Sequence, residues 1–232
     1  KNDRTHIVAL GGVARAEYPA SGAVICDKDV TVPKEKTVAV NVVILRDKAE
    51  IDGGVPVIAE DVVINHLAIM RERYAQMGVW VQYSITTNDP PVTNVPPVDL
   101  SDGLDEADFA PSDEGKSLIS GLGTPATNDI HLFYVNYLAP LPGSSGIAFD
   151  LFSKDYEEKY GNNVFISANE VRPFTPAHEV GHLLWNAAFA HDETNRWSLM
   201  WTPTSATNTA IATKRLSQER ADKMRDNHLL LP

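Results

Sequence analysis

The sequence predicts an α/β fold built on a twisted, mixed sheet with some parallel strands, and three neighbouring segments predict it. Thr37 to Leu45 carries apolar side chains at both alternating sets of positions, as in a strand that is buried on both faces. The stretch from Glu60 to Met77 has apolar residues at helical spacing and is closed by Gly78. Val79 to Ile85 then alternates again, as in a second strand. A strand, a helix packed on it and a second strand form the repeating unit of such sheets.

The first 36 residues are predicted to form a separate N-terminal β appendage or a propeptide-like segment. His6 to Leu10 and Val24 to Ile25 have the composition of short strands, and Gly11-Gly12 and nearby prolines interrupt them. The chain starts with KNDRTH, without an initiator methionine or an apolar leader, so we expect a mature form or an excised domain. Residues 37–232 are expected to form one larger domain.

A long stretch between Thr86 and Asp129 is rich in Pro, Gly and Asp, and we expect it to be a functional or mobile loop with one short helix near Glu114 to Ile119. Regular elements return after it, and the last of them is a C-terminal helix. They are strands at Ile130 to Leu138, Gly146 to Asp150 and Asn163 to Ser167, a helix with Thr175 as N-cap and Pro176 as its first residue, and a helix from Ser217 to Leu229.

Composition excludes several classes of function. The 232 residues include 20 Lys plus Arg and 31 Asp plus Glu, which gives a net charge of −11. A chain with this charge repels phosphate backbones and anionic lipid, so we expect no nucleic-acid partner. No apolar run approaches the length of a transmembrane helix, so we expect no membrane insertion. The single cysteine, Cys26, excludes an intrachain disulfide and a cysteine-rich metal site.

The chemistry is concentrated in residues 175 to 201, where His178 and His182 are four residues apart on the predicted helix. Their imidazoles therefore project from one helix face, about 6 Å apart along the axis. Together with Glu179 they form the HExxH motif of zinc hydrolases. In such a site the metal lowers the pKa of a bound water, and Glu179 takes its proton and later delivers it to the leaving amine. The alternative is a helix that carries two histidines on a packed face.

A catalytic zinc takes three protein ligands, so a third ligand has to come from elsewhere in the chain. We expect His191, because three of the seven histidines then lie within fourteen residues, and Asn186 tolerates the left-handed conformation that would turn the chain back. Asp192 is the rival, either as a ligand or as an acceptor that orients His191. A carboxylate on the last helix, such as Glu219, is a further candidate.

With these motifs the sequence resembles the metzincin clan of zinc metallopeptidases. The likeness extends over roughly Thr37 to Leu230, with strands, helices, an edge strand and a closing helix in the family's order. Two elements carry it: HEVGH at 178–182, and Ser198-Leu199-Met200, which looks like the family's Met-turn. The resemblance gives the HExxH residues their roles as ligand, base and ligand, and it makes Met200 the floor of the zinc site. It also implies that residues 37–232 are a zinc metallopeptidase catalytic domain.

The sequence departs from the family pattern HExxHxxGxxH, which has glycine and histidine where this chain has Trp185 and Ala188. Eight residues, instead of five, separate His182 from His191, so we expect the helix to run longer before it turns. Trp201 follows the Met-turn, where some members of the family have tyrosine.

Motif and resemblance together predict a zinc-dependent endopeptidase that hydrolyses the peptide bonds of proteins. The resemblance implies a secreted or extracytoplasmic location, and it implies that an extended protein or peptide substrate pairs with the edge strand Gly146 to Asp150. Two alternatives stay open: a zinc peptidase with a carboxylate as third ligand, and a binding or adhesion module that keeps the zinc-bearing fold with little turnover. Glu179 favours the enzyme, because a module that only binds does not need a general base.

Cys26 and an acidic stretch are predicted to have structural roles. A lone cysteine is most often a small buried hydrophobe, and the alternative is a cysteine that binds the zinc and keeps the enzyme latent. The acidic stretch is expected to be a solvated loop, because its spacing fits no EF-hand, and Ca²⁺ binding is the alternative. The acidic residues are Asp99, Asp102, Asp105, Glu106 and Asp108.

Overall fold

The chain divides into two units, Lys1–Glu35 together with Pro232, and Lys36–Leu231. The structure, a computed structural model, describes only part of each unit. The described residues are 6–10, 13–17, 24–31, 36–46, 55–87, 115–116, 118–119, 129–136, 138, 145–149, 161–169, 171–185, 191, 198–200, 216, 218–227 and 229–231, of which the first three ranges and residues 149 and 218–220 are described as backbone alone.

The first unit contains a three-stranded antiparallel sheet in the order β1-β2-β3. Its strands are β1 (His6–Leu10), β2 (Val13–Glu17) and β3 (Val24–Thr31). Strand β2 was not predicted, because its sequence VARAE has a weak strand signal. It pairs with β1 over five residues, so its extended conformation comes from the hairpin.

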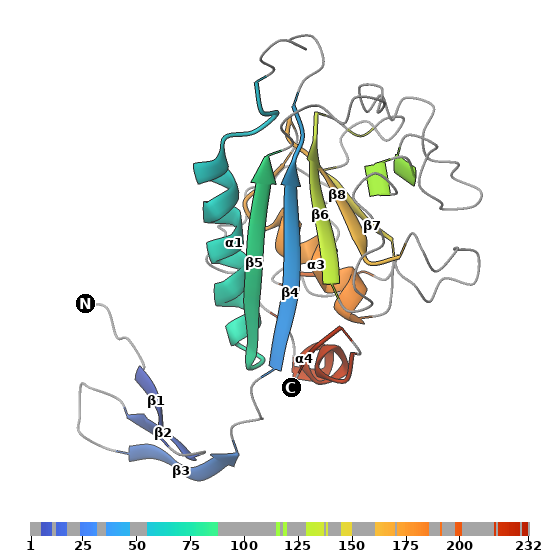
Figure 1. The fold of residues 1–232 in the computed structure, drawn as a ribbon. Helices are drawn as coiled ribbons and strands as arrows, with labels where there is room; N and C mark the ends of the chain where they lie inside the picture. The colour runs from blue at the N-terminus through green and yellow to red at the C-terminus, as the bar shows by residue number, and fades with distance from the viewer. Residues whose placement is uncertain are drawn as a thin grey trace. The chain divides into compact units, whose positions relative to one another are not determined.

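The second unit is built on a five-stranded mixed sheet in the order β5-β4-β6-β8-β7, which confirms the predicted mixed α/β architecture (Figure 1). The strands β4, β5, β6 and β8 are parallel, and β7 lies antiparallel to β8 at one edge. Their bounds are β4 (Lys36–Ile44), β5 (Val79–Thr87), β6 (Asp129–Val135), β7 (Gly146–Phe149) and β8 (Asn163–Ser167).

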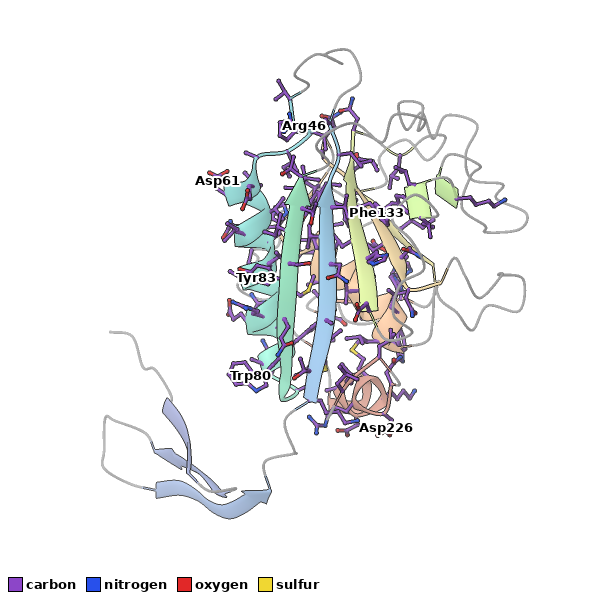
Figure 2. All side chains as sticks on the ribbon, in the orientation of Figure 1. Arg46, Asp61, Trp80, Tyr83, Phe133 and Asp226 are labelled. Atoms are coloured by element: carbon purple, nitrogen blue, oxygen red, sulfur yellow. The ribbon has the colours of Figure 1, made fainter. Side chains whose placement is uncertain are left out.

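Strand β4 contributes to a hydrophobic core on each face of the sheet, as its two-sided apolar pattern predicts. One set of alternating side chains, Val38, Val40, Val42 and Ile44, lies in the larger core together with the helices. The other set includes Val43 and belongs to a smaller core on the opposite face. There the rings of Phe133, labelled in Figure 2, and Phe165 stack at 4.9 Å between centroids.

Helices α1 (Glu60–Ala75), α3 (Thr175–Trp185) and α4 (Gln218–Arg225) belong to this unit. Buried side chains on α1, among them Val63, Leu67, Met70 and Tyr74, recur at helical spacing and pack into the larger core. Helices α1 and α3 contact each other, and α3 also contacts α4, β7 and β8. In Figure 1, α3 is seen behind the sheet and α4 beyond its lower end. No helix in the described part of the chain is long and apolar enough to cross a membrane.

Helix ends differ from the sequence prediction at several points. Helix α1 ends at Ala75 instead of Met77, because Gly78 with φ 70° closes a turn after it. The predicted N-cap Thr175 already belongs to α3, and its Oγ1 accepts a hydrogen bond from the backbone N–H of Arg172, 3.2 Å away. The helix therefore starts from a turn that includes Pro173.

One of the two C-terminal predictions needs correction. Helix α3 spans Thr175–Trp185, and residues 186–190, over which a longer helix was expected, lie outside the described residues. The closing helix spans Gln218–Arg225 and is shorter than the predicted Ser217 to Leu229. Its last turn is followed by hydrogen-bonded turns around Asn227 instead of further helix.

Candidate metal centre

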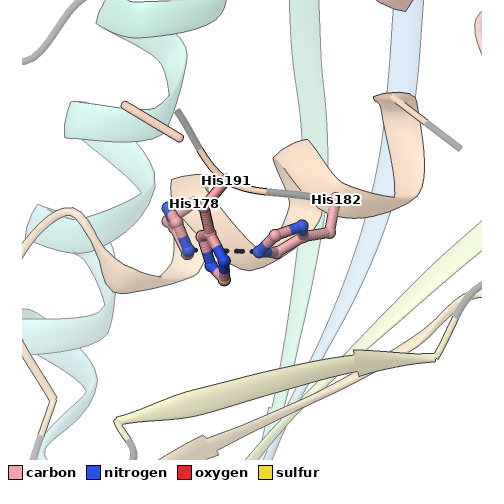
Figure 3. A group of neighbouring side chains, drawn as sticks. All are labelled: His178, His182 and His191. Carbon is pink, nitrogen blue, oxygen red and sulfur yellow. Dashed lines mark hydrogen bonds between the residues drawn. The ribbon is translucent and has the colours of Figure 1, made fainter. Parts of the chain in front are cut away.

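Helix α3 presents His178 and His182 on one face, one helical turn apart. Both side chains are buried, with 7 % and 2 % of their surface exposed. Their Nε2 atoms lie 3.1 Å apart, as the dashed line in Figure 3 shows. The two imidazoles thus aim their ring nitrogens at a common point.

His191 joins this pair from outside the helix. Its ring centroid lies 5.3 Å from that of His178 and 4.8 Å from that of His182. One nitrogen from each of the three imidazoles can be chosen so that all three atoms lie within 4.8 Å of one another. Among the described residues, these three histidines form the group of side chains that could hold a metal ion (Figure 3).

The backbone carbonyl of Leu199 fixes the orientation of His178. His178 Nδ1 lies 2.6 Å from this oxygen, and a carbonyl only accepts hydrogen bonds, so Nδ1 carries the proton and donates it. The neutral imidazole then has an unprotonated Nε2, which is the form that binds metals. A buried donor–acceptor pair of this kind holds a histidine ligand in the required tautomer and ring position.

The donor set fits a zinc ion. Three imidazoles are a common ligand set for catalytic zinc, and Zn–N bonds of 2.0–2.1 Å in a tetrahedral site put ligand nitrogens about 3.3 Å apart. The separation of 3.1 Å between the Nε2 atoms of His178 and His182 is close to this value. Two buried nitrogen lone pairs aimed at each other are unfavourable unless a proton or a cation lies between them. The geometry therefore suits a cation with a preference for nitrogen ligands.

Glu179 lies beside this cluster, with its side chain against the edge strand β7. It is 7 % exposed, and burial raises the pKa of its carboxyl to about 8. A Cβ built on Gly146 would lie 2.6 Å from Glu179 Cγ and 3.1 Å from its Cδ. The absence of a side chain at Gly146 is thus what allows the carboxyl group of Glu179 to pass so close to the strand.

Tyr74 connects helix α1 to the start of the motif. Its hydroxyl donates a hydrogen bond of 2.7 Å to the backbone carbonyl of Ala177, the residue before His178. Burial, and to a lesser degree the charge of Glu179, raise the pKa of Tyr74 well above its usual value. The hydroxyl therefore stays protonated and remains a donor at neutral pH.

Met200 packs directly against the middle of the motif. It is fully buried, and a Cβ on Gly181 would lie 2.6 Å from its Sδ atom. The methyl group of Met224 on α4 lies 3.6 Å from the same point. The lack of a side chain at Gly181 thus leaves room for the side chain of Met200 against the helix.

Several predicted residues lie outside the described part of the chain. Asp192, the rival third ligand, and the side chain of Glu219 are among them, and so are Asp150, Asn186 and the whole acidic stretch from Asp99 to Asp108. Cys26 is described as backbone alone. The structure therefore brings together His178, Glu179, His182, His191 and Met200, and leaves these other predictions untested.

Sequence reasoning missed three contributors to the site, namely Leu199, Gly146 and Tyr74. Leu199 acts through its backbone, so its side chain carries no signal, although its place before Met200 marks the turn. Gly146 was predicted as part of an edge strand but not as a neighbour of Glu179. Tyr74 lies in the segment that was predicted as a helix from its apolar spacing, and a helical pattern does not show which polar atom a hydroxyl reaches.

No protein-family profile and no curated protein sequence matches this chain. Among solved structures it is similar to metalloproteinase-II from Bacteroides fragilis, with 15 % sequence identity and a TM-score of 0.49, over 86 % of this chain and 56 % of that one. It is also similar to a chain in a structure of a chaperone-substrate complex, with 13 % identity and a TM-score of 0.49, over 92 % of this chain and 36 % of that one. This chain thus spans less than two thirds of either solved chain.

Proposed function

We propose that this protein is a metzincin-like, zinc-dependent endopeptidase in which His178, His182 and His191 bind the metal. The observation that carries the proposal is the convergence of three imidazole nitrogens within 4.8 Å, beside the buried carboxyl group of Glu179. A site that only stores or transports zinc does not require a carboxyl group next to the ligands. A hydrolytic site does, because it needs a group that moves protons.

In this proposal each residue of the site has a separate role in the reaction. A bound zinc ion supplies a water of lowered pKa and polarises the carbonyl group of the peptide bond. Glu179 acts as the general base that takes the proton of the attacking water and delivers it to the nitrogen of the leaving amine. His178 is held for its role by Leu199, and Met200 forms the floor below the ligands.

We further propose that the substrate binds as an extended peptide along β7. This strand ends the sheet order, and β8 is its partner among the described strands. A peptide that pairs with the other side of β7 would pass next to Gly146, where Glu179 lies against the strand. The scissile bond would then lie within reach of the base.

The remaining parts of the proposal concern organisation and location. Residues 37–232 are proposed to be the peptidase domain and residues 1–36 an appendage that is not part of the catalytic fold. A secreted or extracytoplasmic protein would be consistent with the family that the sequence resembles. The net charge of −11 supports a protein substrate over nucleic acid.

Cleavage by a Glu179→Gln variant tests the proposal. The substitution keeps the size of the side chain but removes its ability to accept and release the proton, so kcat should fall about 100-fold or more. Zinc content should stay at one ion per chain, because the three imidazoles are unchanged. The measurement is the rate of cleavage of unfolded casein, with zinc quantified by mass spectrometry and with a chelator added in parallel. Glu72→Gln, at an exposed position on α1, is the matched control.

The outcomes separate the alternatives. Cleavage by the wild type that is lost in Glu179→Gln and with chelator supports the endopeptidase. If wild type and variant both bind one zinc and neither cuts any substrate offered, the binding or adhesion module is the better description. If His191→Ala keeps its full zinc content, the third ligand is a carboxylate such as Asp192.

A further inference from the structure

The end of helix α3 decides whether a third histidine can reach the site. The helix ends at Trp185, three residues after His182, while His191 lies nine residues after His182. In an uninterrupted helix, residue 191 would lie about 13.5 Å farther along the axis and on the opposite face. Its ring is instead 4.8 Å from that of His182. The chain must therefore leave the helix before His191.

The local sequence gives one weak reason for the helix to stop, namely Asn186, which tolerates the left-handed conformation that often follows a helix. Residues 186–190 are Asn-Ala-Ala-Phe-Ala, with no glycine or proline, and alanine is the residue with the highest helix propensity. Position 185, where the metzincin pattern has glycine, is a tryptophan. Helices often end with glycine just after the last helical residue, and that signal is missing here.

Asn227 supplies a stop signal from outside the helix. Its side-chain Nδ2 donates hydrogen bonds of 2.9 Å to the backbone carbonyls of both Leu183 and Leu184. In a continuing helix these carbonyls would instead accept the N–H groups of residues 187 and 188. Asn227 is 4 % exposed, so it provides these bonds where water has little access.

The side chain of Asn227 is itself held in this orientation. Its Oδ1 accepts the backbone N–H of Leu229 at 2.8 Å, which leaves the Nδ2 group to face α3. The backbone N–H of Asn227 donates to Met224 at the end of α4, and its carbonyl accepts from Leu230. These bonds fix the amide between the ends of two helices.

We infer that Asn227 is a positioning residue for the third metal ligand. It satisfies the last carbonyls of α3 and so ends the helix at the point from which the chain can return with His191. The inference rests on the proposed function, since it takes His191 as a ligand. In this role Asn227 acts as a C-terminal cap of α3, although it lies more than forty residues away along the chain.

Zinc affinity of Asn227→Ala tests the inference without any need for turnover. Once the amide is lost, the two carbonyls regain partners most readily if the alanine-rich segment joins the helix, which would carry His191 away. We expect about 10- to 100-fold weaker zinc binding, as for loss of groups that orient ligands. The affinity is measured in the full chain by competition with a chromophoric chelator. Asn163→Ala is the matched control, because Asn163 is buried like Asn227 and its side chain donates a hydrogen bond of 2.7 Å to the backbone carbonyl of Gly161.

Two further variants distinguish positioning from general damage. Asn186→Gly places a helix-ending residue directly after Trp185, so it should restore most of the zinc affinity in the Asn227→Ala background. In a His191→Ala background, Asn227→Ala should cause no further loss of zinc affinity, because the ligand that Asn227 positions is already absent. The absorption spectrum of bound Co²⁺ should change in the same way in Asn227→Ala and His191→Ala, since both would lose the same ligand.

The results separate this inference from the proposed function. If His191→Ala does not weaken zinc binding, the proposed ligand set is wrong. If His191→Ala weakens it but Asn227→Ala matches the Asn163→Ala control, the ligand set stands and the role of Asn227 is overturned. Should Asn227→Ala fail to fold, Asn227→Asp replaces it, because it keeps an acceptor for the N–H of Leu229 but has no donor for the carbonyls of α3, and unchanged zinc affinity in that variant likewise overturns the inference.

Discussion

Gly146 on β7 leaves room for the side chain of Glu179. Any Cβ at this position would lie 2.6 Å from Glu179 Cγ, well inside the contact distance of about 3.5 Å between carbon atoms. We therefore expect Gly146→Ala to push the carboxyl group away and to lower kcat about 10- to 100-fold, since a shift of about 1 Å can have that effect. Zinc affinity and KM should change little. Steady-state kinetics and a zinc titration measure the three quantities.

A double-mutant cycle in unfolding free energy gives the control for this prediction. Glu179→Ala has no Cγ, so adding Gly146→Ala to it should cost little stability, while the same substitution destabilises the wild type. Ile166 Cδ1 lies 3.0 Å from the same point and is present in both backgrounds. An equal loss in both backgrounds would show that Ile166, and not Glu179, sets the requirement for glycine.

At the scale of residues, the spacing of neighbouring residues in the sequence was enough to predict part of the site. Contacts between distant parts of the chain could not be predicted in this way. His178, Glu179 and His182 follow from an interval of four residues on one helix. His191 could be proposed only from proximity in sequence. Gly146 and Asn227 contact α3 from parts of the chain that lie far from it in sequence, and no local pattern around either residue predicts such a contact.

Helix α1 is joined to the sheet through a buried polar pair, His66 and Tyr134. His66 Nδ1 lies 3.0 Å from the Tyr134 hydroxyl, and burial lowers the pKa of His66 to about 4. Above pH 6.5 the imidazole is neutral in both the folded and the unfolded chain. As the pH falls from about 6.5 to 4, the unfolded chain binds a proton that the folded protein does not, so stability should fall by up to about 3 kcal/mol.

His66→Asn tests this pH dependence, because asparagine can keep a hydrogen bond to Tyr134 but does not titrate. Urea unfolding at several pH values between 7.5 and 4.5, with chelator present throughout, measures the free energy of unfolding of both proteins. The wild type should lose more stability than the variant over this range. Parallel curves would mean that His66 takes up a proton equally well in both states.

At the scale of elements, periodicity predicted which segments form strands and helices, and neighbouring elements decided where they end. The two-sided strand β4 and the apolar face of α1 lie where the pattern predicts. The last described carbonyls of α3 accept hydrogen bonds from the side chain of Asn227, and α4 ends early because hydrogen-bonded turns follow it. Strand β2 forms between β1 and β3, and both of these strands pair with it. Such tertiary effects do not appear in a local sequence window.

The five described strands of the mixed sheet all belong to the unit formed by Lys36–Leu231. Strand β4, which begins it, pairs with β5 and β6, and both of these strands belong to the same unit. We expect removal of residues 1–35 to leave the zinc affinity unchanged and the midpoint of thermal unfolding within a few degrees of the wild type. Calorimetry and the zinc competition assay check this.

Cleavage assays on the shortened protein give the second readout. An increase in activity at equal zinc content would mean that residues 1–35 hold the peptidase latent. Loss of cooperative unfolding would contradict the expectation, because it would mean that the larger unit depends on the first for its own fold.

The two ends of the unit Lys36–Leu231 are joined by backbone hydrogen bonds. The backbones of Thr37 and Leu231 exchange both possible hydrogen bonds, each of 2.8 Å, as an isolated antiparallel bridge. Paired residues of this kind have Cα atoms about 5.5 Å apart. The chain therefore enters and leaves this unit at neighbouring points. The unit can for this reason be inserted into a surface loop of another protein. A linker of a few residues could equally join its ends and let a circular permutant open elsewhere.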